Sequence, residues 1–204
     1  MCRFIETIRI ENGAVKNLKF HEKRMHDTMK YFYPECTVPD LSSIIEFPEK
    51  YKDRTRCRIL YGKNIEKVEY FPYQIRKVEY LQAVECNSID YGYKYEDRNN
   101  LNRLYDFRGE CDDVLIIRNG LITDTSIANV ALLNYYGKWE TPTTPLLKGT
   151  MRSYLLESGI IKENEIEFSS IHSYSKICLF NAMIPFGEVV LSTEAISASS
   201  IRSE

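Results

Sequence analysis

Apolar and polar residues alternate through the first third of the chain in the pattern of a small antiparallel sheet. Residues 3–10, RFIETIRI, alternate with the period of a strand, and Asn12-Gly13 is a strong signal for a hairpin turn into a short returning strand. Two later runs, RCRILY at 56–61 and EKVEYFPY at 66–73, predict a second pair of strands joined by a Gly-Lys-Asn turn. We therefore expect this part of the chain to build one sheet.

Helical spacing occurs between these strands. Residues 20–32, FHEKRMHDTMKYF, carry apolar side chains with the spacing of one helix face, which predicts an amphipathic helix that ends before Pro34. A second, short helix is predicted after Pro39, with Asp40 or Ser42 as the residue that caps its first backbone N–H groups.

The second half of the chain mixes strands and helices in the same way. A strand is expected to end near Val84, and the tyrosine-rich stretch 90–97 is expected to be irregular. Helices are predicted at 99–107 and at 149–158, the latter ending at Gly159. Further strands are predicted at 113–117, 121–123, 128–134, 138–140, 176–181 and 188–192.

This order of elements indicates a fold of the α/β or α+β class. The chain passes from its first group of elements to its second within residues 74–84, so we place a domain boundary there. The predicted organisation is a small N-terminal α+β domain, residues 1–77, and a larger domain, residues 78–204.

Composition and charge exclude several classes of protein. The chain has 204 residues and a formal net charge of −2, which argues against nucleic acid or a membrane surface as the main partner. No apolar run approaches the roughly 20 residues that cross a bilayer, and the N-terminus lacks the pattern of a signal peptide. The six cysteines form no CxxC pair and no zinc-spaced cluster with histidine, so we expect no metal site, free thiols and a cytoplasmic location.

Two residues are candidates for chemistry. Lys94 lies among tyrosines in YGYKYEDR just before a predicted helix, and Asp124 follows a predicted strand in ITDTSIAN. Each has an ordinary alternative interpretation, because a lysine is commonly a surface residue and an aspartate before Thr and Ser commonly forms a turn or a cap. Gly149 and Thr150 open a predicted helix, whose N–H groups could bind an anion, as at any helix N-terminus.

Six segments, taken together and in order, resemble the class IV aminotransferases, which are pyridoxal-phosphate enzymes of fold type IV. That family includes branched-chain and D-amino-acid aminotransferases and 4-amino-4-deoxychorismate lyase. The segments are FIETIR, FHEKRM, YKYEDR, ITDTSIAN, TPTTPLLKGTMR and FNAMIPFGEV. The resemblance implies a two-domain fold in which the larger, pyridoxal-phosphate-binding domain is an α/β pseudo-barrel.

The resemblance also implies roles for individual residues. Lys94 would form the Schiff base with pyridoxal phosphate and move the substrate proton, Arg24 would bind the cofactor phosphate, and Asp124 would face the pyridine nitrogen. The remaining cofactor-binding residues would be Gly149, Thr150, Met151, Asn181 and Ala182. A substrate carboxylate needs a cation, and the candidates on strands of the smaller domain are Arg9, Arg56 and Arg58.

The segment NAMIP at 181–185 favours the lyase, which converts 4-amino-4-deoxychorismate to 4-aminobenzoate and pyruvate in folate biosynthesis. A branched-chain or D-amino-acid aminotransferase remains the alternative, and a non-catalytic ligand-binding relative remains a second one. The resemblance implies a homodimer. The family usually has a further strand and loop before the segment that FIETIR resembles, and more often has Glu where Asp124 stands. That strand and loop often help to shape the active site or the dimer interface, so the resemblance does not define the substrate selectivity or the interface.

Overall fold

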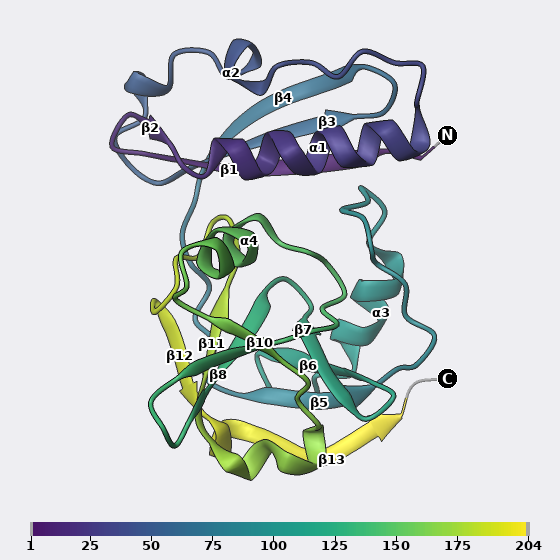
Figure 1. Cartoon of the computed structure of the whole chain (residues 1–204), viewed down its shortest axis with the longest axis vertical. Coiled ribbons are helices and arrows are strands. Elements are labelled where there is room, and N and C mark those ends of the chain that lie inside the picture. Colours follow the sequence, from purple (N-terminus) through teal and green to yellow (C-terminus); the bar gives the residue numbers. More distant parts are fainter. Residues whose placement is uncertain (1, 203–204) are drawn as a thin grey trace. The chain divides into compact units, whose positions relative to one another are not determined.

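The computed structural model describes residues 2–202, and the side chains of residues 2–197. It forms two compact units, and each unit combines a sheet with helices (Figure 1). Unit 1 contains the chain up to Ile75 together with Tyr93–Asp97, and unit 2 contains Arg76–Gly92 and the chain from Arg98 onward. The mixed α/β class expected from the sequence is confirmed.

The segment Tyr93–Asp97 lies in unit 1, although the sequence pattern assigned it to the second half of the chain. Tyr95 forms an isolated antiparallel bridge with Phe4 of unit 1, which explains this placement.

Unit 1 is a four-stranded antiparallel sheet in the order β2-β1-β3-β4, with α1 packed against one face. Asn12 and Gly13 have φ values of 54° and 72°, as the predicted hairpin turn requires. Asp40 is the cap of the short helix, since its side chain accepts a hydrogen bond from the backbone N–H of Ser42 at 2.9 Å. The elements are β1 (Phe4–Glu11), β2 (Ala14–Val15), α1 (Leu18–Phe32), α2 (Leu41–Ile44), η1 (Pro48–Lys50), β3 (Thr55–Tyr61) and β4 (Ile65–Pro72).

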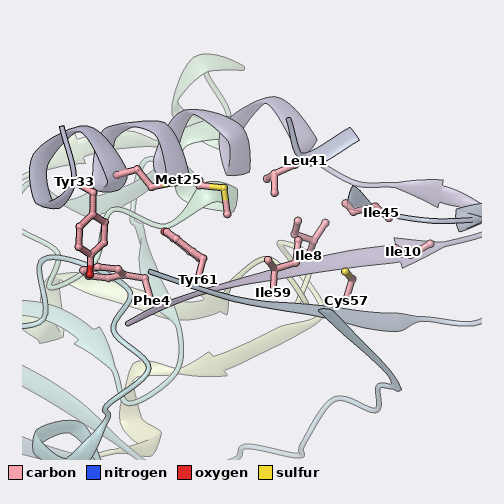
Figure 2. Packing of buried hydrophobic residues seen from close by; sticks show 11 residues of the cluster. Phe4, Ile8, Ile10, Met25, Tyr33, Leu41, Ile45, Cys57, Ile59 and Tyr61 are labelled. Atoms are coloured by element: carbon pink, nitrogen blue, oxygen red, sulfur yellow. The ribbon is translucent and has the colours of Figure 1, made fainter. Parts of the chain in front are cut away.

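Alternation along β1 decides which side chains face α1. Phe4, Ile8 and Ile10 are buried in a core that Met25 and Met29 enter from the helix. Figure 2 shows the strand side chains of this core pointing toward those of the helical side. Ile5, Thr7 and Arg9 lie on the opposite face of the sheet, so one strand supplies both the core and a second surface.

Unit 2 is built on a nine-stranded sheet of mixed direction, with the order β10-β9-β8-β7-β6-β5-β13 and the hairpin β11–β12 joined to β8. The strands β13, β5 and β6 are parallel, whereas β6, β7, β8, β11 and β12 pair antiparallel. Its strands are β5 (Leu81–Glu85), β6 (Asp113–Arg118), β7 (Leu121–Thr125), β8 (Asn129–Asn134), β9 (Trp139–Pro142), β10 (Lys162–Asn164), β11 (Tyr174–Phe180), β12 (Val189–Ser192) and β13 (Ile196–Arg202). Its helices are α3 (Asn99–Asp106), α4 (Thr150–Glu157), η2 (Phe168–Ser173) and η3 (Thr193–Ala195).

Of the helices in the described part of the chain, none combines the length and the apolar character needed to cross a bilayer. Within the same residues, no three His, Cys, Asp or Glu side chains are grouped so that they could hold a metal ion.

Candidate active site

In unit 1, Lys94 lies at the centre of a tight turn that is tied to the edge of β1. The N–H of Tyr95 donates to the carbonyl of Tyr93 at 2.9 Å, which closes a three-residue turn around Lys94. The N–H of Ile5 donates to the carbonyl of Lys94 at 3.0 Å, and the N–H of Glu96 donates to the carbonyl of Arg3 at 2.9 Å. The backbone on both sides of the lysine is therefore fixed by hydrogen bonds.

Aromatic packing holds the same turn. The ring of Tyr93 lies 4.8 Å from that of Phe32 and stacks on Tyr31 at 5.4 Å, while the ring of Tyr95 lies 5.2 Å from that of Phe4. Such ring pairs add to the hydrophobic contribution of the buried surface. The two chain neighbours of the lysine thus anchor the turn against β1 and α1.

The predicted phosphate ligand, Arg24, belongs to a buried network between α1 and β1. Its Nε and Nη2 atoms donate to the two carboxylate oxygens of Glu6 at 2.9 Å and 2.6 Å. Nδ1 of His21 also lies 2.6 Å from Oε2 of Glu6. Glu6 is 0% exposed, so its charge is compensated entirely within the protein.

Electrostatics within this network fix two protonation states. Burial would raise the pKa of Glu6, but the charge of Arg24 and the hydrogen bonds from His21 and Arg24 lower it to about 2. Burial lowers the pKa of His21, and the charges of Arg24 and Lys94 lower it further, against the opposing effect of Glu6. At neutral pH His21 is therefore neutral and donates from Nδ1 to an ionised Glu6. Lys94 and Arg24, which are far apart in the sequence, both act on this one imidazole.

The other face of the unit 1 sheet carries the three arginines predicted to bind the substrate. Arg9 and Arg56 lie directly opposite each other in the register of β1 and β3, and Arg58 follows on the same face. Arg9 forms an ion pair with Glu11 at 3.4 Å.

Arg58 pairs with Glu69 at 3.2 Å and with Glu96 at 3.4 Å. Arg56 differs, because within the described residues its side chain has no ion pair or hydrogen bond. Its guanidinium lies 5.0 Å from the ring centre of Phe71. Arg56 is therefore the arginine of the three that is best suited to a carboxylate from outside the chain.

In unit 2, Asp124 is the last residue but one of β7 and is buried, with 4% of its surface exposed. Its Oδ1 accepts a hydrogen bond from Nδ2 of Asn129 at 2.8 Å, and its Oδ2 accepts one from the N–H of Leu147 at 2.9 Å. Burial raises the pKa of Asp124 to about 6, because the opposing hydrogen bonds and the charge of Arg152 offset only part of the desolvation. A cationic partner would hold this carboxylate in its ionised form.

The start of α4 lies against the same carboxylate network. Nδ2 of Asn129 also donates to the carbonyl of Leu147 at 2.8 Å, so Asn129 links Asp124 to the segment before the helix. Gly149 is the N-cap, and Thr150 and Met151 are the first, buried residues of α4. Because residue 149 is a glycine, the side chain of Asn129 can lie directly against the start of the helix, where a larger residue would leave it no room.

The loop after β11 is organised by Asn181. Its Oδ1 accepts from the N–H groups of Met183 at 2.7 Å and Ile184 at 2.9 Å, and its Nδ2 donates to the carbonyl of Ile127 at 3.0 Å. Ala182 is half-buried within this loop. The side chain of Asn181 therefore has a structural role, and the cofactor contacts of Asn181 and Ala182 stay predictions.

Sequence patterns did not assign roles to Glu6, His21 or Asn129. One signal was present, since Glu6 is a carboxylate on the face of a strand that otherwise carries Phe4, Ile8 and Ile10. A charged residue in that setting requires a buried partner.

Comparison with known proteins places the chain in a family. The model of the family described as amino-transferase class IV matches residues 99–191. A protein of Haemophilus influenzae, itself uncharacterised, is 38% identical over 186 residues, which cover 90% of this chain and 98% of that protein. The aminodeoxychorismate lyase of Saccharomyces cerevisiae is 36% identical over 81 residues, or 37% of this chain and 22% of the yeast protein.

Solved structures agree with this placement. The crystal structure of a proposed 4-amino-4-deoxychorismate lyase from Haemophilus somnus 129pt is 37% identical, with a TM-score of 0.86 over 91% of this chain and 98% of that one. An aminotransferase from Brucella abortus bound to the cofactor PLP shares the fold at 16% identity, with a TM-score of 0.71 over 90% of this chain and 79% of that one. From the family match and the relatives aligned over nearly their whole length, this chain belongs to the class IV aminotransferase family of enzymes.

Proposed function

We propose that this protein is a pyridoxal-phosphate-dependent lyase that converts 4-amino-4-deoxychorismate to 4-aminobenzoate and pyruvate. The observation that carries the proposal is the 37% identity to the proposed lyase of Haemophilus somnus, which extends over 98% of that chain. The match to the yeast aminodeoxychorismate lyase supports it over a shorter stretch. The NAMIP segment at 181–185 resembles the lyase as well.

The residues of each unit suit the cofactor. Unit 1 offers the guanidinium of Arg24 for a phosphate and the amine of Lys94 for an aldehyde. Unit 2 offers the buried carboxylate of Asp124, whose ionised form a cationic partner such as a protonated pyridine nitrogen would stabilise. It also offers the N-terminus of α4, which begins after Gly149 with Thr150 and Met151.

Pyridoxal phosphate, when bound, supplies an electron sink for a carbanion next to the substrate nitrogen. The protein residues would do the remaining work. Lys94 would hold the cofactor and accept the substrate proton, for which its amine must be neutral. Asp124 would keep the proton on the ring nitrogen, and Arg56 would orient the substrate through a carboxylate.

A class IV aminotransferase is the second candidate, because Lys94 and Asp124 would serve amino transfer equally well. The fold shared with the branched-chain aminotransferase of Escherichia coli, with a TM-score of 0.69 at 17% identity, favours this alternative at the level of the fold. The two reactions differ in their products, since only the lyase releases pyruvate together with 4-aminobenzoate.

The first test is the visible spectrum of the protein with pyridoxal phosphate before and after borohydride reduction. We expect a yellow band that reduction converts into a stable adduct on the peptide carrying Lys94. Lys94→Ala should lack the band, and Lys77→Ala, a surface substitution at a lysine paired with Glu79, should retain it. An adduct on another lysine, or no band at all, would overturn the cofactor assignment and favour a non-catalytic ligand-binding protein.

The second test supplies 4-amino-4-deoxychorismate and measures pyruvate and 4-aminobenzoate. Release of both in equal amounts is expected. If neither forms while a keto acid is aminated from a donor amino acid, the protein is an aminotransferase. We also propose that the enzyme is a cytoplasmic homodimer, and a cofactor-loaded monomer in analytical ultracentrifugation would contradict the dimer.

A further inference from the structure

A carboxylate in the core of unit 1 has no part in the chemistry described so far. Glu6 lies on the α1-facing side of β1, between Phe4 and Ile8, and is 0% exposed. An ionised carboxylate in such a place is strongly unfavourable unless its partners compensate the lost hydration. Both of its oxygens are engaged, which indicates that the position is built around the charge.

The geometry of the pair with Arg24 is specific. Nε and Nη2 donate to different oxygens of Glu6, so the contact is bidentate and fixes the plane of the guanidinium. The plane in turn fixes the direction of the Nη1 group. The side chain of Arg24 is 14% exposed, whereas that of Glu6 is fully covered, so the arginine reaches toward the surface from a buried anchor.

His21 holds the anchor itself. Its Nδ1 lies 2.6 Å from Oε2 of Glu6, and the imidazole is 0% exposed. Since α1 carries both His21 and Arg24, two side chains of one helix fix the Glu6 carboxylate on β1. The ordinary interpretation of such a network is that it only joins the helix to the strand.

The net charge of the three side chains helps to distinguish a purely structural network from one that contributes to phosphate binding. Ionised Glu6, Arg24 and neutral His21 carry no net charge together, so surplus positive charge does not make this trio attractive to an anion. Removing the negative charge of Glu6 would increase the electrostatic attraction between this network and a phosphate. The same change would release the guanidinium of Arg24 from its fixed plane. Loss of phosphate affinity on that change would show that orientation is the contribution of Glu6.

We propose that Glu6, held by His21, is a positioning residue that orients Arg24 for the phosphate of the cofactor. This inference rests on the proposed function, because it concerns the binding of pyridoxal phosphate.

The test compares pyridoxal phosphate with pyridoxal, which has the same ring and aldehyde without the phosphate. Dissociation constants are measured from the absorption band for the wild type and for Glu6→Gln, which has nearly the same shape without the charge. We expect the substitution to weaken pyridoxal phosphate binding by about tenfold or more, the scale of one charge-assisted hydrogen bond, and pyridoxal binding by less than about twofold. Inorganic phosphate should also compete less well with pyridoxal phosphate in the variant.

A second pair of variants protects the test against misfolding of Glu6→Gln, which thermal unfolding would reveal. His21→Asn keeps an N–H donor near the position of Nδ1, and His21→Leu removes it while keeping the bulk. We expect His21→Leu to lose phosphate-selective affinity and His21→Asn to retain most of it. Equal losses for pyridoxal phosphate and pyridoxal, or no loss for either, would mean that the network is only structural.

The two proposals fail in different ways. If the wild type forms the Lys94 adduct but Glu6→Gln and His21→Leu bind both ligands as the wild type does, only the positioning role is wrong. If the wild type binds neither ligand, the proposed function is wrong and the positioning role is wrong with it.

Discussion

A Cβ atom on Gly149 would lie 2.0 Å from Oδ1 of Asn129. The side chain of Asn129 therefore fills the space that a residue other than glycine would need at the start of α4. Because the same asparagine donates to Asp124 and to the carbonyl of Leu147, the missing side chain at position 149 lets the carboxylate and the helix start share one hydrogen-bond network.

We expect Gly149→Ala to displace Asn129 and to break its hydrogen bond to Asp124. Overpacking of this kind costs about 1–3 kcal/mol of unfolding free energy. Urea unfolding measures that loss, and the absorption band with pyridoxal phosphate reports the accompanying loss of affinity. Gly92→Ala is the matched control, since its Cβ would meet nothing closer than Asp90 Oδ1 at 3.7 Å. Equal stability of the two variants would contradict the packing argument.

The pH dependence of stability should reveal Asp124 in the cofactor-free protein. Burial raises its pKa from 3.8 to about 6, so between these values the folded state binds more protons than the unfolded state. Stability contributed by this group is therefore present at low pH and is lost as the pH rises through that window, by about 3 kcal/mol. Adding pyridoxal phosphate should reduce the loss, because a protonated ring nitrogen stabilises the ionised carboxylate.

Urea unfolding of the wild type and of Asp124→Asn between pH 4 and pH 7 isolates the contribution of this residue. The difference between the two proteins should change across the window, because asparagine does not titrate. The asparagine of the variant has only one acceptor oxygen for the two donors, the N–H of Leu147 and the side-chain amide of Asn129. We therefore expect a pH-independent loss of about 1–3 kcal/mol of unfolding free energy. Parallel curves would show that the Asp124 pKa is not raised.

Glu6 should show the opposite behaviour. Burial opposes ionisation of Glu6, but Arg24 and His21 outweigh it and lower the pKa from 4.5 to about 2. The unfolded state then binds more protons in this range, so the stabilisation is fully present above 4.5 and is lost as the pH falls toward 2, by about 3 kcal/mol. Glu6→Gln should remove this share of the acid sensitivity. If the unfolding free energy of Glu6→Gln fell with decreasing pH as steeply as that of the wild type, the lowered pKa of Glu6 would be contradicted.

Local signals in the sequence were sufficient for most of the elements. Asn12-Gly13 adopts the positive φ values that its turn requires, and Gly159 ends α4 with a φ of 68°. Both depend on the conformational preferences of single residues, which a sequence shows directly. The strands β10 and β13 were not predicted, because KEN and ISASSIR lack apolar alternation and each is fixed by a parallel partner distant in the chain.

The candidate site was predictable to a smaller extent. The family resemblance named Lys94, Arg24 and Asp124 from short motifs. It could not show that Tyr93–Asp97 pairs with β1, because that pairing depends on which strand edge is available in the folded unit. It also could not show that Glu6 meets Arg24, since that contact requires the packing of a helix on a strand.

The last prediction concerns the substrate carboxylate. Arg9 and Arg56 lie opposite each other across two strands, an arrangement of like charges that is unfavourable unless an anion compensates it. Glu11 compensates Arg9, whereas Arg56 has no carboxylate partner among the described residues. Arg56→Gln should therefore lower kcat/KM by roughly ten- to a hundredfold, about 1.5–3 kcal/mol, mainly through KM.

The cofactor spectrum distinguishes this effect from a loss of the active site. The band with pyridoxal phosphate should be unchanged in Arg56→Gln, because Arg56 is assigned to the substrate alone. Arg54→Gln is the control, since Arg54 pairs with Glu11 at 2.9 Å and has no predicted role in binding. If Arg9→Gln or Arg58→Gln raises KM more than Arg56→Gln does, Arg56 is not the site of the substrate carboxylate. That result would mean that an arginine already paired with a carboxylate of the protein exchanges this partner for the substrate.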